Sequence, residues 1–285
     1  MNRLQLVEQI FSKRSYLCVG LDSDIEKIPT FLLEKDDPVF EFNKQIIDST
    51  RDLCVSYKIN TAFYESSGLK GWQAMEKTVA YIGNEHLVIA DAKRGDIGNT
   101  SSQYAKAFFE TIPFDAITVA PYMGHDSVKP FLEYKNKWTI LLGLTSNPGA
   151  VDFELKKIII EKETLDEGVH LKNSSQTYLY EQVLQTAAGW GNGENLMFVV
   201  GATQADEFIN IRKIIPTHFL LVPGLGAQGG SLKEISAKAL IADCGLLVNA
   251  SRSIIFASTG NDFAEAGRLV AKQYQQEMDA YLPAK

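Results

Sequence analysis

Cysteine is scarce in this chain, and the cysteines that it has are far apart. Cys18, Cys54 and Cys244 each lie within an apolar run of the 285 residues. An odd number of isolated cysteines argues against a disulfide framework, and their spacing does not fit a metal cluster. We therefore expect three reduced thiols in the protein core.

Long hydrophobic runs and an excess of positive charge are also missing. No segment is long and apolar enough to cross a bilayer, and residues 1–14 mix charged with apolar positions instead of forming a signal peptide. We expect no membrane association, a cytoplasmic location and an amphipathic first helix. Because a net charge of -7 would repel a polyanion, nucleic acid is not an expected partner, and an anionic ligand must meet a local basic site.

Short apolar runs, by contrast, recur along the whole chain. Eight of them are predicted to be strands: residues 16–21, 55–59, 86–92, 116–120, 138–144, 196–201, 218–222 and 245–249. Helical spacing marks residues 39–53, 100–110, 177–188, 205–214, 232–242 and 263–281. Strands that are apolar on both faces and alternate with helices predict a parallel sheet covered by helices. Eight such units favour a single-domain (β/α)8 TIM barrel over residues 1–285, with an open doubly wound sheet as the alternative.

One insertion interrupts this regular spacing after the fifth strand. Residues 150–173 are rich in Glu and Lys, and the sequence looks helical from residue 174. We interpret the insertion as an excursion over the top of the barrel whose charges face solvent.

Polar residues follow several of the predicted strands. Asp22 follows the first strand, Lys58 lies in the second, Asp91 and Lys93 end the third, and Ser146 follows the fifth. Active sites of barrels lie at this carboxyl end of the strands. Because side chains alternate along a strand, Asp91 and Lys93 share one face. The joint placement predicts an active site at the barrel mouth.

The stretch from Asp91 to Asp96 crowds two carboxylates around Lys93. Neighbouring carboxylates favour a charged ammonium, which suits a proton donor and disfavours the neutral amine of Schiff-base chemistry. The carboxylates could also bind Mg²⁺, but the ammonium of Lys93 already places a positive charge beside them. A metal is therefore possible and not required. Taken alone, the stretch fits an ion-pair network that caps the strand equally well.

Two features near the C-terminus indicate phosphate binding. A glycine-rich segment, residues 223–230, follows the seventh strand, and Ser251 and Arg252 follow the eighth. Glycines let backbone N–H groups approach an anion, the arginine fork suits phosphate oxygens, and Gln228 offers a further donor. Together they favour the catalytic interpretation of Lys93. The absence of a Gly-x-x-x-x-Gly-Lys-Ser/Thr loop argues against a nucleoside triphosphate site.

These motifs together resemble those of the orotidine 5′-phosphate decarboxylase family. The matching stretches are Asp91-x-Lys93-x-x-Asp96-Ile97, residues 223–230, Ser251-Arg252-Ser253-Ile254, Gly20-Leu21-Asp22, Tyr57-Lys58, residues 146–149 and residues 200–203. The length and the insertion are similar to the longer bacterial branch. The resemblance implies a carboxy-lyase of UMP biosynthesis that acts on orotidine 5′-phosphate without metal or cofactor.

The resemblance also implies a division of roles. Lys93 would deliver a proton to C6 of the pyrimidine, and Asp91 would face the substrate carboxylate. Asp96, with Ile97 and Thr100, would enter the active site of a neighbouring subunit, so that a homodimer completes each site. Asp22 and Lys58 would contact the ribose, and Ser146 would contact the pyrimidine edge. The phosphate end would be contacted by Pro223, Gln228, Ser251 and Arg252.

Two alternatives stay open at this point. A Mg²⁺-dependent sugar-phosphate decarboxylase or synthase on the same barrel shares the Asp-x-Lys-x-x-Asp pattern. Such a relative is expected to carry an acidic metal ligand at the end of the second strand, where this chain has Lys58. A non-catalytic nucleotide-binding barrel is expected to have lost Lys93 or Asp96, and both are present.

Overall fold

A closed barrel of eight parallel strands forms the centre of the computed structural model, which describes residues 1–166, 169–225 and 229–283. The barrel strands are β1 (Leu17–Gly20), β2 (Ser56–Asn60), β3 (Leu87–Arg94), β4 (Ala116–Val119), β5 (Trp138–Leu144), β8 (Leu196–Val200), β9 (Phe219–Pro223) and β10 (Leu246–Ala250). They pair in chain order, and β10 closes on β1. The predicted TIM barrel is confirmed, and every predicted strand overlaps an observed one.

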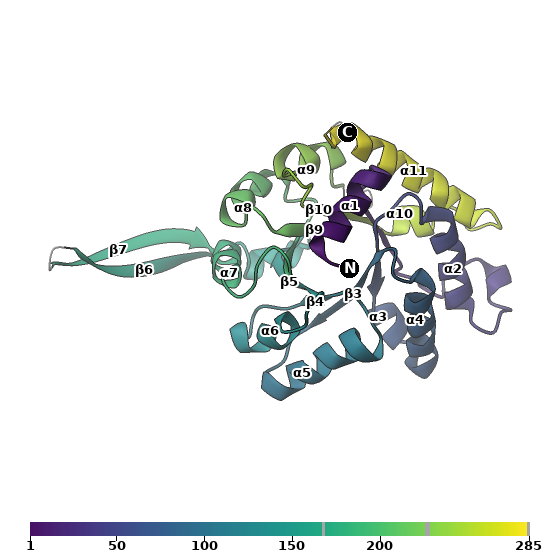
Figure 1. Cartoon of the computed structure of the whole chain (residues 1–285), viewed down its shortest axis with the longest axis horizontal. Coiled ribbons are helices and arrows are strands. Elements are labelled where there is room, and N and C mark those ends of the chain that lie inside the picture. Colours follow the sequence, from purple (N-terminus) through teal and green to yellow (C-terminus); the bar gives the residue numbers. More distant parts are fainter. Residues whose placement is uncertain (167–168, 226–228, 284–285) are drawn as a thin grey trace.

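Helices surround the barrel (Figure 1). They are α1 (Arg3–Lys13), α2 (Pro38–Thr50), α3 (Ala62–Glu65), α4 (Gly68–Ile82), α5 (Gly98–Lys106), α6 (His125–Leu132), α7 (Leu179–Ala187), α8 (Phe208–Ile214), α9 (Leu232–Ala239), α10 (Arg252–Ile255) and α11 (Phe263–Tyr281). Shorter turns are η1 (Thr30–Leu32), the π-helical η2 (Ala107–Thr111), η3 (Pro148–Asp152) and η4 (Ala205–Glu207). In the part of the chain that the structure describes, no helix combines the length and the apolar character needed to cross a membrane.

The predicted first helix and the six other predicted helices are present. The side chain of Asn2 caps α1 by accepting a hydrogen bond from the backbone N–H of Gln5 at 3.0 Å. Two longer helices were not predicted, and both carry residues that weaken a helical signal. Helix α4 begins at Gly68, and α6 contains Pro130.

The insertion is a β-hairpin, which corrects the predicted excursion over the barrel top. Strands β6 (Lys157–Asp166) and β7 (Val169–Tyr178) pair antiparallel in a separate two-stranded sheet. Figure 1 shows the hairpin extending outward from the barrel beside α7. The predicted helix start at residue 174 is wrong as well. Helix α7 begins only at Leu179. The side chain of Glu181 caps this start by accepting a hydrogen bond from the backbone N–H of Tyr178 at 2.7 Å.

The three cysteines are buried and unpaired, as expected. Burial raises the pKa of the Cys54 thiol to about 11 and that of the Cys18 thiol to about 12. Both thiols are therefore protonated at neutral pH, which makes them weak nucleophiles.

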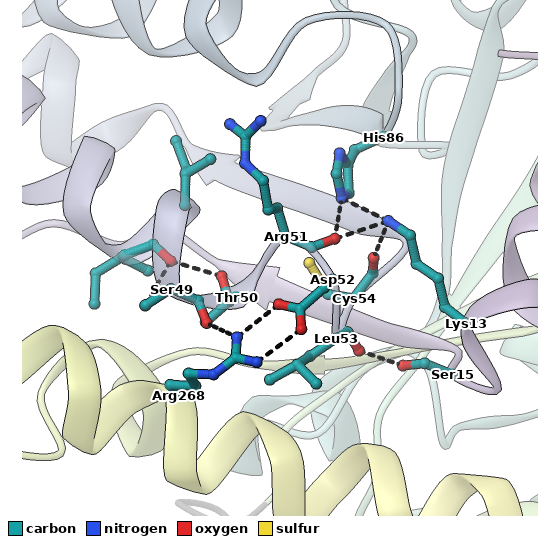
Figure 2. Close-up of polar contacts among 12 residues, drawn as sticks. Lys13, Ser15, Ser49, Thr50, Arg51, Asp52, Leu53, Cys54, His86 and Arg268 are labelled. Carbon is teal, nitrogen blue, oxygen red and sulfur yellow. Dashed lines mark hydrogen bonds and ion pairs between the residues drawn. The ribbon is translucent and has the colours of Figure 1, made fainter.

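A polar network ties α1 to the base of the barrel (Figure 2). The ammonium of Lys13 lies 2.8 Å from the carbonyl oxygen of Arg51 and 2.9 Å from Nε2 of His86. In the same view, Arg268 of α11 donates two hydrogen bonds, of 2.6 and 2.7 Å, to the carboxylate of Asp52. This end of a barrel lies opposite the mouth and serves stability, so we interpret the network as structural.

His86 is predicted to make the fold sensitive to acid. Burial, with the nearby charge of Lys13, lowers the pKa of its imidazole to about 4. Between that value and the unfolded pKa of about 6.5, the unfolded chain binds the extra proton, so stability falls as the pH falls. In urea titrations from about pH 7 to about pH 5, His86→Gln should lose about 2 kcal/mol less unfolding free energy than wild type. Equal losses in the two proteins would contradict this prediction.

Candidate active site

Charged residues at the ends of β1, β2 and β3 form a chain of ion pairs. The ammonium of Lys58 lies 3.0 Å from Oδ2 of Asp91 and 3.4 Å from Oδ1 of Asp22. The ammonium of Lys93 lies 2.6 Å from the other oxygen of Asp91. Asp91 is thus held between two lysines. The structure brings together these four residues, as the sequence predicted.

Strand register explains why these side chains meet. Gly20 is the β1 partner of Lys58, and Asn60 is the β2 partner of Asp91. Residues two apart on one strand point to the same side, so Lys58 and Asn60 share the barrel interior with Asp91. Apolar side chains of the strands fill the interior below them, so the charged groups lie at the mouth.

Burial and opposite charge shift the pKa values of these ion-paired residues in opposite directions. Burial would raise the pKa of Asp91, whose side chain is 12% exposed, but Lys58 and Lys93 together hold that pKa well below its usual range. Burial would lower the pKa of Lys58, but Asp91 and Asp22 raise it above the ordinary value. Asp91 and Lys58 therefore keep their charges at neutral pH. The side chain of Lys93 is 51% exposed, which leaves its ammonium open to a ligand.

The backbone of β3 is distorted where it presents Lys93. Lys93 has a φ of 46°, in the left-handed region that non-glycine residues rarely adopt. The register between β3 and β4 also shifts between Ala90 and Arg94. Bulges of this kind re-aim side chains next to active sites, and strained residues cluster there. The distortion therefore supports a functional interpretation of Lys93.

Thr118 of β4 stabilises this distortion. Its hydroxyl accepts a hydrogen bond from the backbone N–H of Lys93 at 2.9 Å and donates one to Oδ1 of Asp91 at 3.0 Å. Sequence reasoning missed Thr118. It is the one polar residue in the predicted strand 116–120, and side-chain alternation would have been the available signal.

The residues predicted to bind phosphate lie beside these ion-paired side chains. The hydroxyl of Ser251 lies 2.8 Å from Oδ2 of Asp22 and thereby orients that carboxylate. A pocket of about 140 Å³ connects the two parts. It is lined by Asp22, Lys58, Asn60, Asp91, Pro223, Gly224, Leu225, Asn249, Ser251 and Arg252. The predicted contact Gln228 lies outside the described residues.

The other predicted residues lie in loops around the mouth. Ser146 follows β5 and packs against Gly201 at the end of β8. Asp96 accepts a hydrogen bond from the backbone N–H of Ile97 at 2.8 Å, and no ion pair joins it to another residue within the described ranges. Ile97 is 59% exposed, and Thr100 in the first turn of α5 is exposed as well. Ile97 and Thr100 therefore lie at the surface of this chain.

A metal site at this mouth would need several converging ligands. Within residues 1–166, 169–225 and 229–283, no three His, Cys, Asp or Glu side chains converge as a metal site would require. Asp22 and Asp91 offer oxygen atoms, but Lys58 lies between them and bonds to both.

The fold and the mouth together define a (β/α)8-barrel enzyme, with charged groups at the carboxyl ends of the first strands and Pro223, Ser251 and Arg252 at the carboxyl ends of the last two. Residues 15–268 match the model of the Orotidine 5′-phosphate decarboxylase / HUMPS family. The chain belongs to this family, and the resemblance predicted from its motifs is confirmed.

Named relatives agree with this assignment. The orotidine 5′-phosphate decarboxylase of Flavobacterium johnsoniae is 56% identical over the full length of both chains. The solved structure of Leishmania donovani OMP decarboxylase has a TM-score of 0.76 and 33% identity, covering 98% of this chain and 99% of that one. Leishmania donovani UMP synthase has a TM-score of 0.80 and 35% identity over 97% of this chain, which spans only 55% of that longer protein. The predicted enzyme class, carboxy-lyase, is that of the named decarboxylases.

Proposed function

We propose that this protein is an orotidine 5′-phosphate decarboxylase, which converts orotidine 5′-monophosphate (OMP) to uridine 5′-monophosphate (UMP) in the last step of de novo UMP synthesis. The observation that carries the proposal is the ion-paired chain of Asp22, Lys58, Asp91 and Lys93 at the barrel mouth. Full-length identity of 56% to a named decarboxylase supports it. As a biosynthetic enzyme, the protein is proposed to act in the cytoplasm.

Lys93 is proposed as the acid of the reaction. The bond between C6 and the carboxylate breaks, its electron pair stays on C6, and carbon dioxide leaves. The ammonium of Lys93, held 2.6 Å from Asp91, stabilises the developing negative charge and gives its proton to C6. Solvent then reprotonates the lysine. Asp91 faces the substrate carboxylate and fixes the position of Lys93, so the step needs neither a metal nor an organic cofactor.

The remaining residues of the mouth are proposed to bind the nucleotide. Asp22 and Lys58 bond to the ribose hydroxyls, and Ser146 bonds to the pyrimidine edge. The phosphate is held by Arg252, by the backbone at Ser251, by the residues next to Pro223 and by Gln228. Binding energy from a phosphate far from C6 can order loops around the reacting group and raise turnover as well as affinity.

A homodimer with shared active sites is part of the proposal. Asp96, Ile97 and Thr100 are proposed to contact the substrate bound to the partner subunit. Exposed apolar side chains support an interface near this segment, because Ile97 is 59% exposed and Met123, which lies against Gly95, is 44% exposed. Exposed apolar groups of this kind commonly mark contact surfaces between proteins.

Independence from metal distinguishes this proposal from a Mg²⁺-dependent sugar-phosphate enzyme. The purified protein is predicted to consume OMP at the same rate in excess EDTA as with added Mg²⁺, because Lys93 supplies the positive charge that a metal would otherwise provide. The fall in ultraviolet absorbance as OMP becomes UMP measures this rate. Turnover that requires Mg²⁺, or that occurs only with a sugar phosphate, would support the alternative.

A further inference from the structure

Asn249 of β10 is a buried polar residue that the proposed mechanism does not use. The residue is 6% exposed, and among the residues that the structure describes its Oδ1 has no hydrogen-bond partner. Leaving a buried acceptor unpaired is unfavourable, and native proteins rarely tolerate it without a reason. The unpaired oxygen therefore needs an explanation.

Strand register places Asn249 inside the barrel, beneath the mouth. Asn249 is the β10 partner of Cys18 in β1, and two residues further along β1 Gly20 is the partner of Lys58. Because residues two apart on a strand point to the same side, Asn249 faces the same interior as Lys58. The carboxamide of Asn249 also lines the pocket between the charged chain and Arg252.

The absence of a side chain at Gly20 lets its backbone pack closely against this carboxamide and against Ser251. A Cβ atom at Gly20 would lie 3.1 Å from Oδ1 of Asn249 and 2.9 Å from Oγ of Ser251, with the Cβ of Ser251 only 2.7 Å away. Any larger residue would crowd both groups. The terminal bond of an asparagine side chain also rotates between two orientations, so Oδ1 can turn from Gly20 toward the pocket.

Other acceptors of the pocket already have donors. The oxygens of Asp22 accept hydrogen bonds from Lys58 and Ser251, and those of Asp91 accept from Lys58, Lys93 and Thr118. Oδ1 of Asn249 has none within the described ranges. A ligand that satisfies it must bring a donor, which a phosphate ionised at neutral pH does not. The hydroxyls of a sugar bring such donors.

We propose that Asn249 is a further nucleotide-binding residue, whose carboxamide oxygen accepts a hydrogen bond from a ribose hydroxyl. This inference rests on the proposed function, since it names a contact within the same nucleotide site. It assigns a sugar contact to β10, next to the proposed phosphate contact of Arg252 in α10. The pocket then discriminates between nucleotides that carry and that lack this hydroxyl.

Binding of UMP, 2′-deoxy-UMP and 3′-deoxy-UMP, measured by calorimetry on the purified full chain, tests this contact. Asn249→Leu, which keeps the branched shape and removes the acceptor, is expected to weaken UMP binding about tenfold, as for a lost hydrogen bond to a buried group. The same variant should bind one of the deoxy analogues within about twofold of wild type, because that analogue has already lost the contact. Asn249→Ala should behave in the same way, and a normal thermal melt shows that each variant is folded.

Thr139→Val is the matched control. Thr139 of β5 is also buried with an unpaired hydroxyl in the described structure, but it does not line the pocket. Its replacement should leave the affinity for all three ligands unchanged. Unaltered UMP binding by Asn249→Leu, or equal losses for all three ligands, would overturn the role of Asn249 while leaving the proposed function intact. Failure of the wild-type protein to bind or turn over its nucleotide would instead refute the proposed function.

Discussion

Lys93→Ala is expected to lower kcat for OMP by at least about 10⁴-fold, because it removes both a general acid and the fixed charge beside C6. UMP should still bind measurably. Arg252 is unchanged in this variant, and Lys58 remains paired with Asp91 and Asp22. Steady-state kinetics gives the loss of turnover, and calorimetry with UMP gives the retained affinity.

Lys77→Ala is a suitable control for this variant. Lys77 is an exposed lysine that pairs with Asp37 at 2.8 Å, away from the residues that line the mouth pocket. Turnover by this control should equal that of wild type, because an exposed ion pair contributes little even to stability. A Lys93→Ala enzyme that kept more than about a tenth of wild-type turnover would refute the proposed role of Lys93.

Mixing inactive Lys93→Ala and Asp96→Ala subunits is expected to restore activity. If Asp96 acts in the partner's site, a mixed dimer has one site with both changes and one site with neither. Half of the dimers in an equal random mixture are mixed, so the recovered activity should approach about a quarter of the wild-type value. The assay requires subunit exchange, for which the two variants are unfolded and refolded together.

Each variant refolded alone is the control for this experiment and should stay inactive. Recovery is expected because Lys93 pairs with Asp91 and not with Asp96 of its own chain in the described structure, and Ile97, which follows Asp96, is exposed. A mixture as inactive as its two parents would show that Asp96 does not act across a subunit interface.

The sequence predicted the barrel and much of the candidate site for identifiable physical reasons. Parallel strands covered on both faces are apolar throughout, so all eight were visible as short runs. The carboxyl ends of barrel strands meet at one mouth, so Asp22, Lys58, Asp91 and Lys93 were expected to lie together, and they do. Local pattern and topology were sufficient for these features.

Features that depend on the register between strands were not predicted. Thr118 contacts Asp91 and Lys93 where the register between β3 and β4 shifts, between Ala90 and Arg94. In the sequence, Asn249 ends an apolar run that predicts a strand. Its unpaired oxygen is a feature of the three-dimensional structure, because it depends on the residues around it. The charges of the insertion predict a solvent-facing excursion, whereas its three consecutive isoleucines, Ile158 to Ile160, favour the strand that the structure shows.

The most direct test of the central claim, that the protein decarboxylates OMP with proton transfer to C6 and without a metal, is the reaction of wild-type protein with OMP in D₂O containing excess EDTA. Exchangeable ammonium hydrogens become deuterium in this solvent, so the acid that meets C6 carries a deuteron. Proton NMR of the product is predicted to show UMP deuterated at C6, formed in step with the loss of OMP. Unchanged OMP, or UMP that carries ordinary hydrogen at C6, would contradict the account.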